Sequence, residues 1–379
     1  MTDLQVVEKT IMLIIVECCN LNCSYCYEFH KSDSKMDFYT AKRVLDHELT
    51  DTKYERFMIQ LFGGEPFINF ELIQQIDAYL LEYYSDIKYH IFIPTNGTLF
   101  TPAIKDWLVE RKQRITVGLS LDGTKSMHDT NRSKSFDSID LQFFLVHYPQ
   151  QACKMTISNE TIPYMAEGII YLTELGFKVL ASFAEGIVYN PATAQVVVKQ
   201  FQKLVDFYLK HPQYTVCNLL DENIHLIGHN DESMEKWCGC GKHLIAYDSV
   251  GDKYPCQLFS PISLGDRACQ FKNKDEEFIA KLGDFRDAVC KDCLFKAICP
   301  SCCGMNWLTK NNLAVRDETV CLFTKIRFYF TAYYLYKKFF SERKTNEKLN
   351  QHEYAVLIGI QKVIAYFEND PVGSQIIHI

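Results

Sequence analysis

Short apolar runs alternate with longer amphipathic segments through the first 210 residues. The apolar or β-branched runs predict strands at Ile11–Val16, Phe57–Phe62, His90–Pro94, Ile115–Leu121, Cys153–Ser158 and Phe177–Phe183. Segments with apolar residues at helical spacing follow these runs and predict helices at Asp37–Leu49, Phe70–Tyr84, Pro102–Arg111, Asp137–His147, Pro163–Leu175 and Ala192–Lys210. Six strand–helix units in a row predict a parallel sheet with helices outside it.

The segments that directly follow the predicted strands are the expected place for functional residues. A parallel sheet of this kind carries its active site at the carboxyl ends of its strands. These segments are Glu17–Cys26, Gly63–Pro66, Thr95–Thr98, Asp122–Arg132, Asn159–Thr161 and Ala184–Gly186.

The chain changes character after His211-Pro212, which ends the last of these helices. A polar connector leads to a loop-rich segment dense in cysteine, and an aromatic helical tail begins at Leu322 and includes a second helix at Glu353–Phe367. The expected domains are 1–213 for the strand–helix domain, 214–237 for the connector, 238–325 for the cysteine-rich domain and 326–379 for the C-terminal helices. The tail is expected to pack on the main domain, and a partner-docking surface is the alternative.

Composition and charge narrow the classes of function. The net charge of −7 and the pI near 5.9 argue against a nucleic-acid or anionic-membrane partner. No apolar run reaches about 18 residues, and Met1–Lys9 does not resemble a signal peptide, so a cytoplasmic protein is expected. Its 16 cysteines then point to metal or redox chemistry instead of disulfides. They concentrate in two places, with four between Cys18 and Cys26 and ten between Cys238 and Cys321.

The first cysteine group has the spacing CxxxCxxC, formed by Cys19, Cys23 and Cys26 just after the first predicted strand. Three thiolates on one loop can hold three irons of a cubane and leave the fourth iron open to a small molecule. Buried structural thiols or half of a zinc site are the alternatives. After the second strand comes Gly63-Gly64-Glu65-Pro66, where two glycines allow a backbone to approach a ligand closely.

Together these segments resemble the radical S-adenosylmethionine (SAM) superfamily over about residues 10–210. The matching features are the three spaced cysteines with Tyr25 before the last, Gly63-Gly64-Glu65-Pro66, Thr95-Asn96-Gly97, Ser120-Leu121-Asp122-Gly123, His128-Asp129 and Arg132. The resemblance implies a partial (β/α)6 barrel whose cysteines bind a 4Fe–4S cluster with SAM on the open iron. In the superfamily the cluster donates one electron to the sulfonium, the S–C5′ bond breaks, and the 5′-deoxyadenosyl radical abstracts a substrate hydrogen.

The resemblance also implies the contacts to SAM. The Gly63–Pro66 loop would face the methionine amine, Tyr25 would lie near the adenine, and Ser120 would reach the ribose or carboxylate. The expected cofactor-binding residues are Tyr25, Gly63, Gly64, Glu65, Pro66, Thr95, Asn96, Ser120, Asp122 and Lys154. Family members often hold the carboxylate with an arginine on the helix after the fourth strand. Asp137–His147 has none, so Lys154 or Arg132 is expected to substitute.

The second cysteine group follows the pattern C…Gx4C…CxxCx5CxxxC…C, which resembles the SPASM auxiliary-cluster domain. That resemblance implies one auxiliary 4Fe–4S cluster on Cys238, Cys240, Cys256 and Cys303, and another on Cys290, Cys293, Cys299 and Cys321. Cys302 competes with Cys240 as the fourth ligand of the first set and is expected to be a packed thiol. A structural zinc module is the alternative, and the absence of a paired histidine motif favours iron.

One departure from the family narrows the reaction. Anaerobic sulfatase-maturating enzymes carry an aspartate base directly after the Gx4C cysteine, whereas Gln257 stands there in this chain. An amide cannot take up a proton at neutral pH. The hypothesis is therefore a radical SAM/SPASM maturase that forms a thioether or carbon–carbon cross-link in a ribosomally made peptide. The alternatives are a peptide epimerase or oxidase, a sulfatase-maturating-type enzyme and, outside enzymes, a zinc-rich interaction protein.

The expected partners are the peptide substrate and a reducing electron donor. Because the first strand begins by Ile11, no winged peptide-recognition domain is expected before it. A leader peptide would then bind elsewhere on the chain or through a separate recognition protein.

Overall fold

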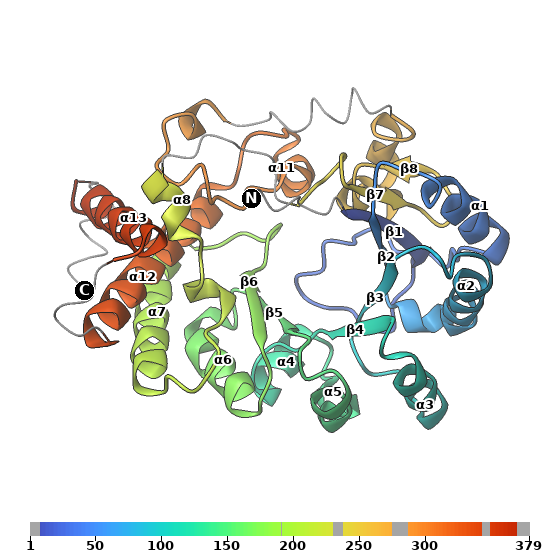
Figure 1. The fold of residues 1–379 in the computed structure, drawn as a ribbon, viewed down its shortest axis with the longest axis horizontal. Helices are drawn as coiled ribbons and strands as arrows, with labels where there is room; N and C mark the ends of the chain where they lie inside the picture. Colours follow the sequence, from blue (N-terminus) through green and yellow to red (C-terminus); the bar gives the residue numbers. More distant parts are fainter. Residues whose placement is uncertain (1–7, 191, 230–237, 275–286, 343–348, 370–379) are drawn as a thin grey trace. The chain divides into compact units, whose positions relative to one another are not determined.

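The computed structural model describes residues 8–190, 192–229, 238–274, 287–342 and 349–369. Parts of the expected connector (230–237) and of the expected C-terminal helices (343–348 and 370–379) lie outside these residues. The chain forms two compact units, coloured along the sequence in Figure 1. The first unit comprises Met1–Leu121, Arg132–Cys153 and Glu235–Phe285, and the second comprises Asp122–Asn131, Lys154–Met234 and Arg286–Ile379.

The first unit is built on a six-stranded sheet in the order β4-β3-β2-β1-β7-β8. Its strands are β1 (Glu8–Val16), β2 (Arg56–Gly63), β3 (Tyr89–Thr95), β4 (Ile115–Leu119), β7 (Leu244–Tyr247) and β8 (Lys253–Tyr254). The pairs from β4 through β1 to β7 are parallel, and only β7 and β8 are antiparallel. The parallel-dominated α/β fold predicted from the strand–helix alternation is confirmed.

Strand β1 lies at the centre of this sheet because its sequence is apolar on both faces. Every residue from Ile11 to Val16 is buried, as expected for a parallel strand covered on both sides. Its partners on either side are β2, with Leu13 opposite Leu61, and β7, with Leu13 opposite Tyr247. The sequence did not predict β7 and β8, which have four and two residues, too few for a periodic pattern to show.

Helices α1 (Phe38–Glu48), α2 (Phe70–Tyr83) and α3 (Pro102–Arg111) run along one side of strands β1–β4 (Figure 1). Asp37 caps α1, since its carboxylate accepts from the Thr40 N–H at 2.7 Å. The helix predicted at Asp137–His147 is shorter and begins at α5 (Leu141–His147), because Asp140 caps it through the Phe143 N–H. A short 3-10 turn (Phe136–Ser138) precedes it. The remaining short helices of the unit are η1 (Pro66–Asn69), η5 (Gln257–Phe259), α9 (Pro261–Leu264) and η6 (Gly265–Gln270).

The second unit contains a two-stranded sheet and most of the helices. Its elements are α4 (Lys125–Asn131), β5 (Cys153–Ile157, with Cys153 in the first unit), η3 (Ile162–Tyr164), α6 (Met165–Glu174), β6 (Val179–Phe183), α7 (Thr193–Lys210), η4 (Asn218–Leu220), α8 (Ile224–His229), η8 (Ala288–Cys290), α11 (Cys303–Lys310), α12 (Glu318–Glu342) and α13 (Gln351–Asn369). The aromatic tail packs as predicted, because α12 contacts α7, where Phe201 and Phe330 stack at 5.4 Å. Helix α13 contacts α12 and α8. Within the described residues, we find no helix with the length and apolarity needed to cross a bilayer.

Candidate active site

The loop after β1 carries Cys19, Cys23 and Cys26, each half-buried. A turn brings the last two together, since the Cys26 N–H donates to the Cys23 carbonyl oxygen at 3.2 Å. Two sulfurs already accept from the protein: Cys19 Sγ from the Leu21 N–H at 3.4 Å, and Cys26 Sγ from Lys31 Nζ at 3.3 Å. Burial is the main reason that the pKa of Cys19 is raised to about 11. Neighbouring Glu65 and Cys23 add to the rise, so the loop gathers negative charge that a bound cation would relieve.

The Gly63-Gly64 pair lies directly against the backbone that enters this cysteine loop. The Gly64 N–H donates to the Val16 carbonyl oxygen at 3.1 Å, and the Glu65 N–H donates to the Cys18 carbonyl oxygen at 3.0 Å. A Cβ on Gly63 would overlap the Val16 carbonyl, and one on Gly64 would overlap the Cys18 carbonyl. Gly63 also has a φ of 142°, which side-chain-bearing residues rarely adopt. The two glycines are therefore required by a close approach of two loops.

The Glu65 carboxylate is the most buried acidic group beside the cysteines, with 1% of the residue exposed. Oε1 accepts from Thr95 Oγ1 at 2.8 Å and from the Phe67 N–H at 3.3 Å, and Oε2 accepts from the Asn96 N–H at 2.8 Å. Burial raises the pKa of Glu65 to about 7, against these hydrogen bonds and the charge of Arg132. The end of β3 thus holds the carboxylate of the Gly63–Pro66 loop, the loop that was predicted to face the methionine amine.

Two polar links tie the cysteine loop to neighbouring loops. The Asn20 side chain accepts from Asn96 Nδ2 and donates to Thr98 Oγ1, both at 2.8 Å. On the other side, the Asn22 N–H donates to Ser133 Oγ at 2.9 Å. These bonds fix the loop at both flanks.

Arg132 lies beside Tyr25, with its guanidinium carbon 5.4 Å from the ring centroid. It is 7% exposed and also acts electrostatically on Glu65. Arg132 and Lys154 are the two cations that were predicted to replace the missing arginine. Arg132 belongs to the same unit as the cysteine loop. Lys154 belongs to the second unit, where its Nζ donates to Ser182 Oγ at 2.8 Å.

The remaining predicted cofactor residues follow β4. The Ser120 N–H donates to the Thr95 carbonyl oxygen at 2.9 Å, which places it beside the end of β3. Asp122 is fully buried in the second unit, where Oδ1 accepts from the Thr156 N–H at 2.8 Å and Oδ2 from Asn131 Nδ2 at 3.1 Å. Its own N–H donates to His128 Nδ1 at 3.2 Å. Asp122 thus links the end of α4, through Asn131, to β5.

Sequence reasoning missed the polar residues that follow Cys26. Lys31 reaches back to Cys26, and buried Glu28 interacts with both Lys31 and Glu65. Burial raises the pKa of Glu28 to about 8, because the nearby Lys31 only partly offsets the lost hydration. The Tyr27 side chain is hydrogen-bonded to Gln257. Their signal was present as polar residues one to five positions after the last spaced cysteine.

Glu17, the first residue after β1, is a second group that the sequence did not single out. Its carboxylate is buried and accepts from Ser32 Oγ at 2.6 Å and from Ser249 Oγ at 2.7 Å. These bonds join the start of the cysteine loop to Ser32, which follows the last spaced cysteine, and to Ser249 in the turn after β7. Nothing local in the sequence pairs residues 232 positions apart.

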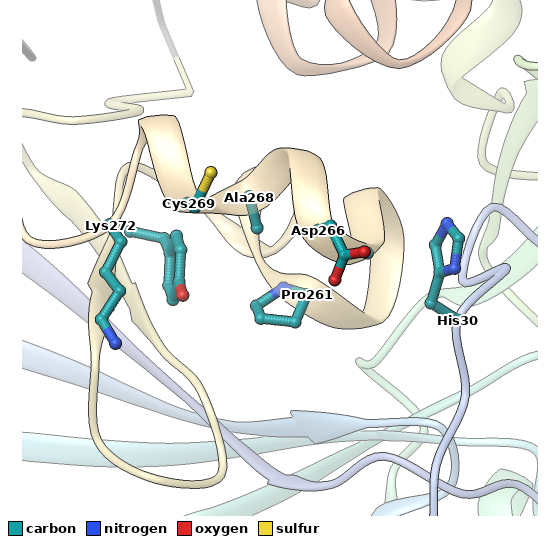
Figure 2. Close-up of a pocket in the computed structure, with 8 residues that line it drawn as sticks. His30, Pro261, Asp266, Ala268, Cys269 and Lys272 are labelled. Carbon is teal, nitrogen blue, oxygen red and sulfur yellow. The ribbon is translucent and has the colours of Figure 1, made fainter.

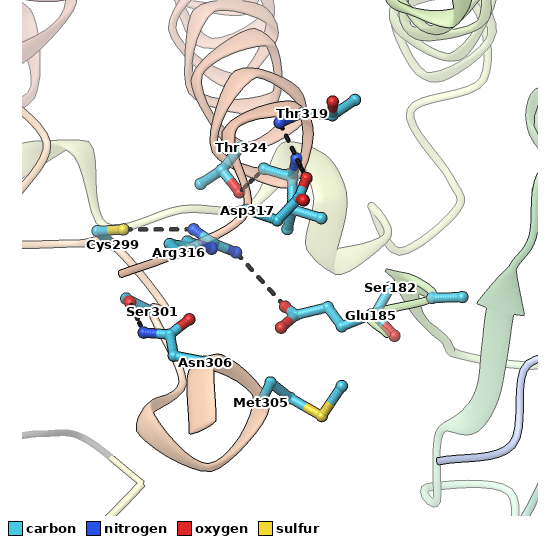
Figure 3. Close-up of polar contacts among 12 residues, drawn as sticks. Ser182, Glu185, Cys299, Ser301, Met305, Asn306, Arg316, Asp317, Thr319 and Thr324 are labelled. Carbon is cyan, nitrogen blue, oxygen red and sulfur yellow. Dashed lines mark hydrogen bonds and ion pairs between the residues drawn. The ribbon is translucent and has the colours of Figure 1, made fainter. Parts of the chain in front are cut away.

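In the second unit, Cys290, Cys293, Cys299 and Cys321 form one group of half-buried thiols. Each interacts electrostatically with others of the set, and burial together with Cys299, Cys293 and Cys321 raises the pKa of Cys290. Figure 3 shows Arg316 beside Cys299, with Nη1 3.5 Å from Sγ. The structure thus brings together the four cysteines expected to hold one auxiliary cluster.

The other predicted auxiliary set is divided between the units. In the first unit Cys238 is exposed, Cys240 lies with its Sγ 3.6 Å from the Pro255 carbonyl oxygen, and Cys256 is buried near Tyr27. Cys303 begins α11 in the second unit, directly after Cys302. Cys18, Cys153, Cys217 and Cys269 belong to neither set.

No three His, Cys, Asp or Glu side chains are placed to hold a single metal ion in the described ranges between residues 8 and 369. A cubane differs from such a site because each thiolate binds a different iron, so its ligands need not converge on one point. The donor chemistry of both described groups, thiolates without histidine, suits iron–sulfur clusters.

A pocket of about 670 Å³ lies in the first unit. Figure 2 draws the residues that line it. Its lining residues are His30, Tyr254, Pro261, Gly265, Asp266, Ala268, Cys269 and Lys272. His30 comes four positions after Cys26, and its N–H donates to the Ile262 carbonyl oxygen at 3.0 Å. Cys269 on η6 is an exposed cysteine and also lines this pocket.

Comparisons with known proteins agree with this arrangement. Residues 13–139 match the family described as the radical SAM superfamily. An uncharacterized protein of Methanocaldococcus jannaschii is 28% identical over 263 residues, which cover 67% of this chain and 87% of that protein. The cysteine-type anaerobic sulfatase-maturating enzyme of Clostridium perfringens is 24% identical over 80% of this chain and 90% of its own length. The radical SAM cyclopropyl synthase TigE of Paramaledivibacter caminithermalis is 26% identical over 43% of this chain and 38% of its own.

Solved structures share the fold. Native anSMEcpe with bound AdoMet and Cp18Cys peptide aligns with a TM-score of 0.67 and 20% identity, over 88% of this chain and 98% of that chain. Streptococcus suis SuiB bound to the precursor peptide SuiA aligns with a TM-score of 0.56 and 16% identity, over 83% and 76%. The chain thus carries a radical SAM domain over β1 to β4, in which the cysteine loop and the Gly-Gly-Glu loop are hydrogen-bonded to each other at the strand ends.

Proposed function

We propose that this enzyme is a peptide maturase that uses SAM to install a cross-link in a ribosomally made peptide. The observation that carries the proposal is the pair of backbone hydrogen bonds between the Gly63–Glu65 loop and the chain that enters the cysteine loop, which sets the buried Glu65 carboxylate near Cys19. Peptide modification is supported by relatives over most of the chain, among them sulfatase-maturating enzymes, and by neighbours of the same fold that carry bound peptides.

In this proposal Cys19, Cys23 and Cys26 would hold the cluster that binds SAM. Glu65, held by Thr95 and Asn96, would receive the SAM amine, because a buried carboxylate gains most from a positive partner. Arg132 would receive the SAM carboxylate beside Tyr25. When bound, the cluster and SAM supply an electron and a 5′-deoxyadenosyl radical that removes a hydrogen atom from the peptide.

The two auxiliary sets would hold one 4Fe–4S cluster each. Cys290, Cys293, Cys299 and Cys321 would form one, and Cys238, Cys240, Cys256 and Cys303 the other. A cross-link removes two hydrogens from the peptide, so one further electron and one proton must leave after the first hydrogen atom. The auxiliary clusters would accept that electron. An external reductant would supply the electron that is needed at the cluster on Cys19, Cys23 and Cys26. Cysteine thiols stay reduced and free to bind iron in a reducing compartment, which favours a cytoplasmic enzyme.

A sulfatase-maturating activity is the second candidate, supported by 24% identity to the Clostridium perfringens enzyme over 80% of this chain. Gln257 argues against it, since its amide is hydrogen-bonded to Tyr27 and cannot serve as a base. Product mass separates the remaining alternatives. A cross-link or an oxidation lowers the peptide mass by two hydrogens, while epimerisation leaves it unchanged.

The proposal is tested with the full chain, reconstituted anaerobically with iron and sulfide and reduced with dithionite. We expect about twelve irons per chain and formation of 5′-deoxyadenosine from SAM. The triple variant C19A/C23A/C26A should lose about four irons and all 5′-deoxyadenosine formation, while the neighbouring Cys18→Ala should keep both. Unchanged 5′-deoxyadenosine formation by the triple variant would falsify the assignment.

A further inference from the structure

Two charged residues, Arg316 and Asp317, directly precede helix α12 and lie close to the cysteine group of the second unit. Asp317 caps the helix, since Oδ1 accepts from the Thr319 N–H at 3.0 Å and from the Val320 N–H at 3.2 Å (Figure 3). The Cys321 N–H donates to the Asp317 carbonyl oxygen at 2.9 Å, so Cys321 sits in the first turn. Lys310 at the end of α11 pairs with the same carboxylate at 3.1 Å. Arg316, directly before this cap, is therefore anchored by the helix start.

The Arg316 guanidinium lies between Cys299 and Glu185 (Figure 3). Nη1 donates to Cys299 Sγ at 3.5 Å, and Nη2 pairs with Glu185 Oε1 at 3.4 Å. The side chain is 9% exposed, and its buried Nε has no hydrogen-bond partner among the described residues. The same guanidinium also acts electrostatically on Cys321. One buried cation thus faces two of the four cysteines.

Glu185 comes from the loop that directly follows β6, one of the segments in which the sequence predicted functional residues. Neighbouring Gly186 has a φ of 91°, and a Cβ there would lie 3.5 Å from Met305 Cε, so this loop packs on α11. Lys154 acts electrostatically on Glu185 from β5. Glu185 opposes Arg316 and is placed to weaken its effect on the cysteines.

We propose that Arg316 raises the reduction potential of the auxiliary cluster on Cys290, Cys293, Cys299 and Cys321, and that Glu185 is the positioning residue that limits this rise. The inference rests on the cluster assigned under the proposed function. A cluster held by four thiolates is net negative and becomes more so on reduction, so a nearby cation stabilises the reduced form. Hydrogen bonds to ligand sulfurs and local charge are recognised determinants of such potentials. A raised potential makes this cluster the better electron acceptor.

The test is a potentiometric titration of the reconstituted full chain, followed by electron paramagnetic resonance without SAM or peptide. The C19A/C23A/C26A background removes the signal of the first cluster. In Arg316→Gln, one auxiliary cluster should become about tenfold harder to reduce, a shift of about −59 mV for one electron. Arg316→Lys should retain part of the parent potential, and Glu185→Gln should shift the same cluster in the positive direction. Arg267→Gln, an exposed arginine on η6, is the matched control and should change nothing.

The possible outcomes distinguish a failure of the Arg316 inference from a failure of the proposed function. C290A/C293A should lose about four irons; if it loses none, the ligand assignment fails whatever Arg316 does. If the cluster is present and neither Arg316 variant moves its potential, the inference is overturned while the maturase proposal stands. If Arg316→Gln does not assemble the cluster, Arg316→Lys and Glu185→Gln decide: shifts of opposite sign support the inference, and two unchanged potentials refute it.

Discussion

The Glu65 carboxylate provides a stability test that needs neither SAM nor a cluster. In the folded chain its pKa is raised to about 7 by burial, from an ordinary value of 4.5. Between these two pH values the folded protein binds more protons than the unfolded chain. Its free energy of unfolding therefore falls as the pH rises through this window. The shift corresponds to about 3 kcal/mol, because each pKa unit is worth about 1.4 kcal/mol.

Glu65→Gln keeps the shape of the side chain and removes its titration. The amide oxygen can face the Asn96 N–H, and the amide nitrogen can donate to Thr95 Oγ1, which then accepts. The Phe67 N–H loses its acceptor in this orientation, at a cost of about 1–3 kcal/mol that does not depend on pH. As the pH rises from acid to weakly alkaline, the free energy of unfolding of the variant should therefore increase by about 3 kcal/mol relative to that of the parent.

The measurement is urea unfolding of the metal-free, reduced chain at several pH values across the window, with both proteins handled anaerobically. Glu71→Gln, an exposed glutamate on α2, is the matched control and should follow the parent at every pH. A difference between Glu65→Gln and the parent that stays constant across the series would refute the reasoning, because burial would then not control this carboxyl.

Three further predictions concern contacts elsewhere in the chain. Gly64→Ala should separate the Gly63–Glu65 loop from the cysteine loop and reduce cluster content, measured as iron per chain after reconstitution; an iron content equal to the parent's would refute it. Lys9→Met should destabilise the fold by about 3–5 kcal/mol in urea unfolding, because it leaves buried Glu48 without its cation. Asp317→Ala should cost about 1 kcal/mol through loss of the α12 cap, and a thermal unfolding curve equal to the parent's would contradict it.

The parts of the fold that sequence predicted are those whose signal is local. Six apolar runs and their helices were placed within a few residues, because burial on both faces of β1 and one-sided burial of α1 leave clear periodicities. The CxxxCxxC spacing and the Gly-Gly-Glu-Pro loop predicted the superfamily, which the comparison confirms. Helix α4 was missed because its sequence, KSMHDTN, has little apolar spacing.

The parts that sequence could not predict depend on contacts between distant residues. Strand β7 pairs with β1, although more than two hundred residues separate them in the sequence. The four residues of β7 contain no pattern that identifies β1 as their partner. The bond from Ser249 to Glu17 is of the same kind. Lys31 and Arg316 look like ordinary surface cations in the sequence, and only the folded chain shows each against a cysteine sulfur.

Each of these two cations donates to a cysteine sulfur within its own unit, and this similarity has a chemical consequence. Lys31 donates to Cys26 with Glu28 nearby, and Arg316 donates to Cys299 with Glu185 nearby. Glu28 and Lys31 follow the last spaced cysteine of the first group, whereas Arg316 stands between Cys299 and Cys321 and Glu185 comes long before that set. Because ligand spacing decides where a cluster forms while local charge and sulfur hydrogen bonds adjust its potential, two chains with identical cysteine patterns need not share a potential. The residues between the motifs are therefore where enzymes of this family can differ in electron flow while keeping the same metal sites.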